Sequence, residues 1–281
     1  MNAQKRVMAL HDISCFGRCS LTVALPIISA VGYETAVIPT AVLSTHTGGF
    51  ENYTYRDLTE DIEPIARHWQ SLSLGFDAIY SGFLGSFRQI EIVKTLFEDF
   101  KTEDNIILVD PVMGDNGKLY SVFSKDFPQG MRTLCQNADI IVPNITEAVL
   151  MLDEEYREGP YTQSYIEILL KKLAAIGAKK VVLTGVYFDD IDLGAASYDA
   201  ESGLVSYSFS KRIEGYYHGT GDVFGSALLG ALLSDKPLET AVKIAVDFTT
   251  ASIARTKAAG TDVRFGVNFE EGLGALIAAC K

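Results

Sequence analysis

Residues 218–222 read HGTGD, and an apolar helical pattern begins directly after Asp222. Glycine lets a backbone approach a ligand closely, and a helix N-terminus presents unpaired N–H groups and the positive end of a dipole. This segment therefore predicts an anion site. An aspartate there would repel a bare anion, unless its carboxylate takes a proton from a hydroxyl group that attacks a bound phosphoryl group. Asp222 is a candidate general base, and a simple helix N-cap is the alternative.

Further oxygen-bearing side chains follow the apolar runs that we interpret as strands. In open parallel sheets, ligands bind beyond the carboxyl ends of the strands, so these side chains should meet at one edge. Carboxylates, an amide and hydroxyl groups are ligands that suit Mg²⁺ together with phosphates. The residues concerned are Asp110 and Asp115 after the run 105–109, Asn144 and Glu147 after 139–142, and Thr184 after 181–183.

A third segment, HDISCFGRCS at residues 11–20, spaces His11, Cys15 and Cys19 four residues apart. On a helix, that spacing would align three metal ligands. The segment follows a predicted strand and contains Gly17, so a continuous helix is not expected. We expect Cys15 and Cys19 to be small, semi-buried thiols and His11 to be a hydrogen-bonded scaffold residue, as we also expect of His218.

Other phosphate and metal motifs are absent from the sequence. It contains no GxxxxGK[ST] loop, no GxGxxG after the first apolar run, no HExxH and no paired CxxC. These absences disfavour a P-loop nucleotidase, a dinucleotide-dependent oxidoreductase and a zinc site.

Short apolar runs alternate with longer helical patterns along the chain, which predicts a parallel sheet with helices on both faces. We expect strands at 6–10, 35–43, 77–82, 105–111, 138–144 and 179–185, and helices at 20–32, 58–72, 86–100, 124–137, 146–153 and 163–176. The runs 193–199 and 203–210 alternate apolar with polar residues and predict an antiparallel hairpin at the sheet edge. A long helical region should follow to residue 258. No linker or repeat interrupts residues 1–281, so one domain is the simplest organisation.

Composition limits the partners and the compartment. The chain has 281 residues, 48% of them hydrophobic, and a net charge of −12. That charge disfavours nucleic acids and membrane surfaces as partners. Four scattered cysteines and an N-terminal apolar run of only four residues predict a cytoplasmic protein. No stretch approaches the 18 apolar residues of a membrane span.

The motifs together resemble the ribokinase superfamily, and more closely its pyridoxal (vitamin B6) kinase branch. GTGD at 219–222 is typical of the whole superfamily. Further matching segments are STHTGG (44–49), YSGFLGS (80–86), DPVMGD (110–115), ADIIVPNITEA (138–148) and LTG (183–185). The order SGFLGS, DPVMGD and PNxxE indicates the B6 kinase branch. The resemblance implies a ribokinase-like three-layer αβα sandwich with a central, mostly parallel sheet. It also implies ATP-dependent phosphorylation of the 5′-hydroxymethyl group of pyridoxal, pyridoxamine or pyridoxine, in vitamin B6 salvage.

The resemblance also implies roles for individual residues. Asp222 would deprotonate the substrate hydroxyl group, and the N–H groups of Gly219, Thr220 and Gly221 would form the anion hole. Asp110, Asn144 and Glu147 would organise Mg²⁺, directly or through water. Asp115, Thr184 and Asn144 would lie near the ATP phosphates, where this family often also holds a monovalent cation such as K⁺. His46, Thr47 and Phe83 would border the pyridine ring, and the loop after the first strand would line the same pocket.

Two positions depart from the branch. Asp12 stands where serine is usual and would meet the polar edge of the ring; an ionised carboxylate can only accept hydrogen bonds, which would favour a protonated ring nitrogen or a cationic aminomethyl group. Phe83 stands where tyrosine is commoner. The alternatives are a surface or capping carboxylate for Asp12 and ordinary core packing for Phe83. These departures leave the preferred vitamer open.

Other functions are compatible with parts of the pattern. Hydroxymethylpyrimidine kinase of thiamine metabolism shares the implied fold and a similar ring alcohol. A non-catalytic sensor of vitamer or nucleotide is a second alternative, but it would need no base at Asp222. The family resemblance further implies a homodimer.

Overall fold

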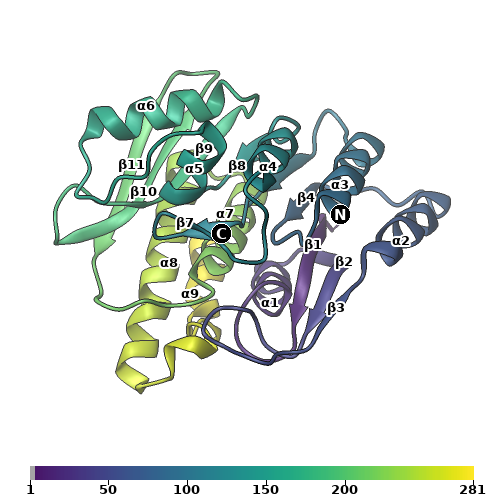
Figure 1. Cartoon of the computed structure of the whole chain (residues 1–281), viewed down its shortest axis with the longest axis horizontal. Helices are drawn as coiled ribbons and strands as arrows, with labels where there is room; N and C mark the ends of the chain where they lie inside the picture. Colours follow the sequence, from purple (N-terminus) through teal and green to yellow (C-terminus); the bar gives the residue numbers. More distant parts are fainter. Residues whose placement is uncertain (1–3) are drawn as a thin grey trace.

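A nine-stranded sheet runs through the middle of the molecule, between two layers of helices (Figure 1). The computed structural model describes residues 4–281. The strand order across this sheet is β11-β10-β9-β8-β5-β4-β1-β2-β3. Its parallel part comprises β1 (Arg6–Ser14), β2 (Glu34–Leu43), β4 (Ala78–Ser81), β5 (Ile106–Val109), β8 (Ile140–Ile141) and β9 (Lys180–Val186).

Antiparallel strands complete the sheet at both edges. At one edge lies β3 (Tyr55–Asp57), and at the other lies the hairpin of β10 (Asp192–Asp199) and β11 (Val205–Lys211). The expected edge hairpin is therefore confirmed. The β-branched and leucine runs of the central strands are buried on both faces, because helices cover each face.

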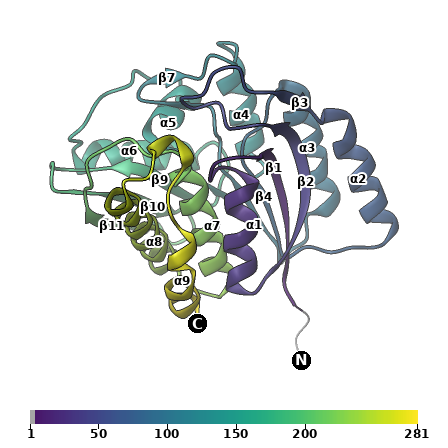
Figure 2. The same ribbon diagram turned by 90° about the horizontal axis from the view of Figure 1, so that it is seen from below.

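Two apolar cores separate the layers. One core packs α2 (Thr59–Ser71), α3 (Phe87–Phe100), α4 (Phe127–Cys135), α5 (Ile145–Leu152) and α6 (Gln163–Ala174) against the sheet. The other packs α1 (Leu21–Val31), α7 (Thr220–Leu233), α8 (Leu238–Ala259) and α9 (Leu273–Cys280) against the opposite face (Figure 2). The predicted three-layer ribokinase-like sandwich is confirmed.

Local signals fix several helix ends. The Ser86 side chain accepts a hydrogen bond from the Gln89 N–H group at the start of α3, as expected of a helix cap. Asn144 and Glu147 form a reciprocal capping box at the start of α5. Gly32 ends α1 with a φ of 111°, a conformation that glycine adopts without strain.

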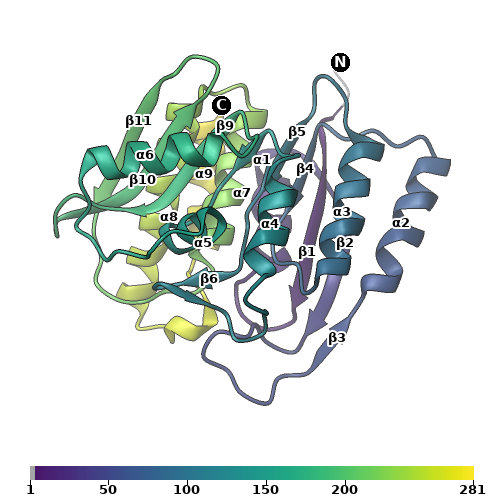
Figure 3. The same cartoon turned by 45° about the horizontal axis from the view of Figure 1, so that its top comes forward.

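The structure differs from the sequence predictions in several elements. Strand β1 continues to Ser14, so His11 and Asp12 lie in the strand and not in a following loop. Strand β8 has only two residues, and β3 and α9 were not anticipated. A small hairpin of β6 (Gly114–Asp115) and β7 (Lys118–Leu119) interrupts the expected loop after β5 (Figure 3). Helix α7 begins at Thr220, three residues earlier than its apolar pattern indicated.

Within residues 4–281, none of the helices combines the length and apolar character that crossing a membrane requires.

Candidate active site

One cavity of about 520 Å³ opens at the carboxyl ends of the parallel strands. Every candidate residue of the sequence analysis lines it, although these residues come from segments spread over more than 200 positions. They are Asp12, His46, Thr47, Phe83, Asp110, Asp115, Asn144, Glu147, Thr184, Gly219, Thr220, Gly221 and Asp222. The expected convergence on one edge of the sheet is therefore confirmed.

Helix α7 starts in the geometry of an anion site. Gly219 is its N-cap with a φ of 73°, and the first backbone hydrogen bond runs from the Val223 N–H group to the Gly219 carbonyl oxygen. The preceding N–H groups therefore have no partner inside the helix. Asp222 lies in the first turn, three residues after the cap. The alternative interpretation of Asp222 as an N-cap is wrong, because Gly219 holds that position.

The surroundings of Asp222 shift its acidity. Burial raises the pKa of this carboxyl from its usual value near 3.8 to about 6, and the nearby charge of Asp12 contributes to the rise. The Cys19 thiol, whose sulfur lies 3.4 Å from Oδ2 of Asp222, opposes it by donating a hydrogen bond. A carboxylate whose pKa lies this close to neutrality is a stronger base than an ordinary aspartate and is still ionised at physiological pH.

Asp110 follows β5, and the capping box of α5 follows the neighbouring strand β8. The Asn144 side chain accepts from the Glu147 N–H group and donates to the Gly114 carbonyl oxygen, both at 2.9 Å. The two Glu147 carboxylate oxygens accept from the Asn144 and Met113 N–H groups, at 2.9 and 3.1 Å. Asn144 and Glu147 are therefore rigidly held by backbone groups.

Asp110 differs from these two residues because no hydrogen bond supports its side chain within the described residues. It is 6% exposed, and burial together with the nearby Glu147 and Asp222 charges raises its pKa well above the usual range. A buried carboxyl group without a partner beside a second carboxyl group is either protonated or bound to a cation, and a bound cation would restore its ionised form.

This donor set fits Mg²⁺ that is bound partly by substrate. Residues 4–281 contain no cluster of three His, Cys, Asp or Glu side chains able to hold a metal ion on their own. Mg²⁺ typically uses one or two carboxylates, water and substrate phosphates, and not a cage of protein ligands. Asp110 offers free oxygens, and Glu147 can contribute through its remaining lone pairs.

Asp12 lies on β1 and faces the same cavity. It is 4% exposed, and its Oδ2 accepts a hydrogen bond from the Ser14 hydroxyl group at 3.0 Å. Burial raises the pKa of this carboxyl. The alternative of a surface or capping carboxylate is therefore wrong. Phe83 lines the cavity, and its ring also packs against Phe123 with the ring centres 5.6 Å apart.

His46 borders the cavity with both ring nitrogens already engaged. Its Nε2 lies 2.6 Å from the Arg264 carbonyl oxygen, and its Nδ1 lies 3.1 Å from the Gly48 backbone nitrogen. A carbonyl can only accept and an N–H group can only donate, so the proton resides on Nε2 and the ring is neutral. Burial also lowers the pKa of His46. His46 can therefore offer a substrate its ring carbons but no free polar atom.

Several cavity residues were missed by the sequence analysis. One apolar wall comes from α8, through Val246, Thr249, Thr250 and Ile253. The helical pattern there predicted a helix but gave no signal that one side faces a ligand. Cys19 touches Asp222, a contact that its spacing could not reveal. Cys15 is exposed and not semi-buried, and His11 is fully buried without a hydrogen-bond partner for either ring nitrogen.

The fold and this cavity match what is expected of a kinase of the ribokinase-like class: a helix start with unpaired N–H groups, a buried carboxyl group with a raised pKa and a second buried carboxyl group meet at the edge of a parallel sheet. A sequence model of the phosphomethylpyrimidine kinase family matches residues 25–266. The chain therefore belongs to this family.

Solved structures agree with this assignment. The chain is 35% identical to Lactobacillus plantarum pyridoxal kinase, with a TM-score of 0.89 and coverage of 99% and 98% of the two chains. A Bacteroides thetaiotaomicron protein of the phosphomethylpyrimidine kinase type, crystallised with pyridoxal, is 37% identical, with a TM-score of 0.93 and coverage of 97% and 96%. The pyridoxal kinase of Arabidopsis thaliana is 27% identical over 276 residues, which are 92% of this chain and 85% of the relative.

Proposed function

We propose that the protein transfers the γ-phosphoryl group of ATP to the 5′-hydroxymethyl group of pyridoxal or a related B6 vitamer, in vitamin B6 salvage. The observation that carries this proposal is the position of Asp222 in the first turn of α7, buried in the cavity beside unpaired N–H groups. The similarity to a pyridoxal kinase and to a structure that contains pyridoxal supports the choice of acceptor.

Asp222 takes the proton of the acceptor hydroxyl group as that oxygen attacks the γ-phosphorus atom. The N–H groups of Gly219, Thr220 and Gly221 stabilise the charge on the transferred group, aided by the positive end of the α7 dipole. Phosphoryl transfer depends mainly on such positioning and charge stabilisation. A raised pKa suits Asp222, since the carboxylate has to hold the proton it accepts.

Mg²⁺ would be held by Asp110 directly and by Glu147 through water, with Asn144 fixing the orientation of Glu147 through the capping box. When bound, Mg²⁺ neutralises charge on the ATP phosphates. Asp115 and Thr184 line the same part of the cavity and would border the phosphates, where K⁺ is a further candidate ligand.

The two ends of the cavity differ in chemistry. Asp12, with its buried carboxylate, would accept a hydrogen bond from the polar edge of the vitamer ring, and Phe83, His46 and Thr47 would border the ring. The apolar wall of α8 would receive the adenine base, because it offers a flat ring a surface between Val246 and Ile253.

The test is phosphorylation by the purified protein with Mg²⁺ and K⁺ present, with pyridoxal, pyridoxamine, pyridoxine and hydroxymethylpyrimidine offered separately. We expect turnover with at least one B6 vitamer. Turnover with hydroxymethylpyrimidine alone would assign the protein to thiamine metabolism. ATP binding without turnover of any acceptor would favour a sensor and contradict the proposed function.

We further propose that residues 1–281 act as a single kinase domain, that the protein works in the cytoplasm, and that it forms a homodimer. The few, scattered cysteines support the compartment, and the family membership supports the dimer. Size-exclusion chromatography with light scattering tests the dimer, for which a mass near twice 30.6 kDa is expected.

A further inference from the structure

The main chain of Arg18 is confined between two glycines from distant segments. A Cβ atom on Gly219 would lie 2.0 Å from the Arg18 carbonyl oxygen, and a Cβ atom on Gly266 would lie 2.4 Å from it. Both glycines have a positive φ, 73° and 81°, which other residues adopt only with strain. The Arg18 carbonyl group therefore occupies a slot between the start of α7 and the C-terminal segment 261–270.

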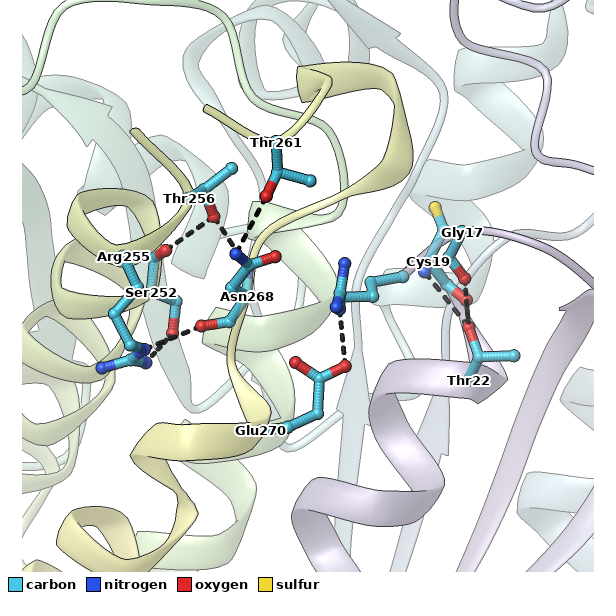
Figure 4. Close-up of polar contacts among 10 residues, drawn as sticks. Gly17, Cys19, Thr22, Ser252, Arg255, Thr256, Thr261, Asn268 and Glu270 are labelled. Carbon is cyan, nitrogen blue, oxygen red and sulfur yellow. Dashed lines mark hydrogen bonds and ion pairs between the residues drawn. The ribbon is translucent and has the colours of Figure 1, made fainter. Parts of the chain in front are cut away.

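Arg18 is also bonded to that segment. Its N–H group donates to the Phe265 carbonyl oxygen at 2.9 Å, and its guanidinium Nε donates to Oε1 of Glu270 at 2.5 Å. Figure 4 shows Glu270 pointing from the C-terminal segment toward the loop that carries Gly17 and Cys19, and this contact is the ion pair with Arg18.

The segment 261–270 is itself fixed to α8. Arg255 donates to the Asn268 carbonyl oxygen at 2.8 Å, and the Asn268 N–H group donates to the Thr256 hydroxyl oxygen at 2.7 Å (Figure 4). Val267 and Phe269 are buried in the apolar core of this layer. The segment is therefore a firm support for Arg18.

The residue after Arg18 touches the proposed base. Cys19 donates from its thiol to Asp222, and its own N–H group donates to the Thr22 hydroxyl oxygen at 3.2 Å. The oxygen of the same hydroxyl group lies 2.8 Å from the Cys19 carbonyl oxygen and 3.0 Å from the Gly17 carbonyl oxygen, so Thr22 holds the loop beside Arg18. Any displacement of Arg18 is thus passed to Cys19 and, through Gly219, to the N-terminus of α7.

We propose that Gly266 is a positioning residue for the reaction: by leaving space for the Arg18 carbonyl group, it sets the Cys19–Asp222 contact and the start of α7. Gly266 is not among the residues that line the cavity. This inference rests on the proposed function, because it assigns a support to the proposed base.

The test compares Gly266→Ala with Gly260→Ala in the full chain. Gly260 also has a positive φ, 61°, and no atom within 4 Å of an added Cβ, so this control adds a methyl group at a left-handed position without the collision. The ψ of 179° at Gly266 adds backbone strain that Gly260, with a ψ of 25°, lacks. We expect Gly266→Ala to lower kcat at least about tenfold, because misplacement of reacting groups by about 1 Å costs up to about a hundredfold. The KM for ATP should stay within about twofold, since the α8 wall is not displaced. Gly260→Ala should retain both constants.

A double-mutant cycle that combines Gly266→Ala with Cys19→Ala tests whether Gly266 acts through Cys19. If Gly266 acts through Cys19, the loss of kcat in the double variant is smaller than the product of the two single losses. Equal kcat values for Gly266→Ala and Gly260→Ala, or multiplicative losses in the cycle, would overturn the inference.

A second variant and the activity of the wild type distinguish failure of the inference from failure of the proposed function. If Gly266→Ala does not fold, Glu270→Gln provides a second test, because it removes the ion pair that holds Arg18. We expect this variant to lower kcat two- to fivefold at an unchanged KM for ATP, since an exposed ion pair contributes little energy. An unchanged kcat would overturn the inference. A wild-type protein without any phosphotransfer would refute the proposed function and the inference together. An active wild type with an unaffected Gly266→Ala variant would refute the inference alone.

Discussion

Replacing Asp222 by asparagine should stabilise the protein at neutral pH while it removes the base. Burial raises the pKa of Asp222 from near 3.8 to about 6, so folding favours the protonated carboxyl. The contribution of this group to stability is therefore fully present below pH 4 and is lost as the pH rises from about 4 to about 6. A pKa rise of about two units lowers the free energy of unfolding by roughly 3 kcal/mol at pH 8.

Asparagine is neutral at every pH and has nearly the same shape, so it avoids that loss. We expect the free energy of unfolding of Asp222→Asn to exceed that of the wild type by about 2 to 3 kcal/mol at pH 8 and by about zero at pH 4. Urea unfolding followed by circular dichroism at both pH values provides the measurement.

A matched control is Asp235→Asn, whose side chain is 91% exposed and 3.5 Å from Lys5. Its unfolding free energy should differ from that of the wild type by less than about 1 kcal/mol at both pH values. The reasoning is refuted if Asp222→Asn is no more stable than the wild type at pH 8, or if its gain does not depend on pH.

Three further outcomes follow from the site. Because the proposed base must be ionised, kcat/KM should rise with pH through a value of about 6 and then level off, and a flat profile between pH 5 and pH 8 would contradict this. Asp110→Asn should raise the Mg²⁺ concentration for half-maximal activity at least about tenfold, measured by titration at fixed ATP, whereas an unchanged Mg²⁺ requirement would exclude Asp110 as a ligand. Asn144→Ala removes the cap of α5, so it should lower the free energy of unfolding by about 1 kcal/mol and raise the KM for Mg-ATP. The control Ser86→Ala removes the cap of α3 and should show the same loss of stability without the change in KM.

Periodicity and capping residues were sufficient to predict most of the fold. The helix beginning after Ser86 and the edge hairpin lie close to the expected positions, because their signals are local. The bounds of an element were predicted less accurately where contacts with distant segments determine them. Strand β1 extends through His11 and Asp12 because β2 continues to pair with it, and no local pattern in HDIS indicates that pairing.

The cavity was predictable wherever a residue directly follows a strand or starts a helix. Asp110, Asn144 and Asp222 stand at such places, so the topology of a parallel sheet brings them together. The α8 wall was not predictable, since any side of a buried helix carries similar apolar residues. Cys19 was unpredictable for another reason: its contact with Asp222 joins positions 203 residues apart through the slot that holds Arg18.

The most direct test of the central claim is the rate of phosphoryl transfer from ATP to pyridoxal by the wild type and by Asp222→Asn, with ATP binding measured separately by calorimetry. We predict that the wild type phosphorylates pyridoxal. The kcat of the variant should be lower by about 10²- to 10⁴-fold or more, while it binds ATP as tightly as the wild type does. Turnover by the variant at the wild-type rate would contradict the assignment of Asp222 as the base.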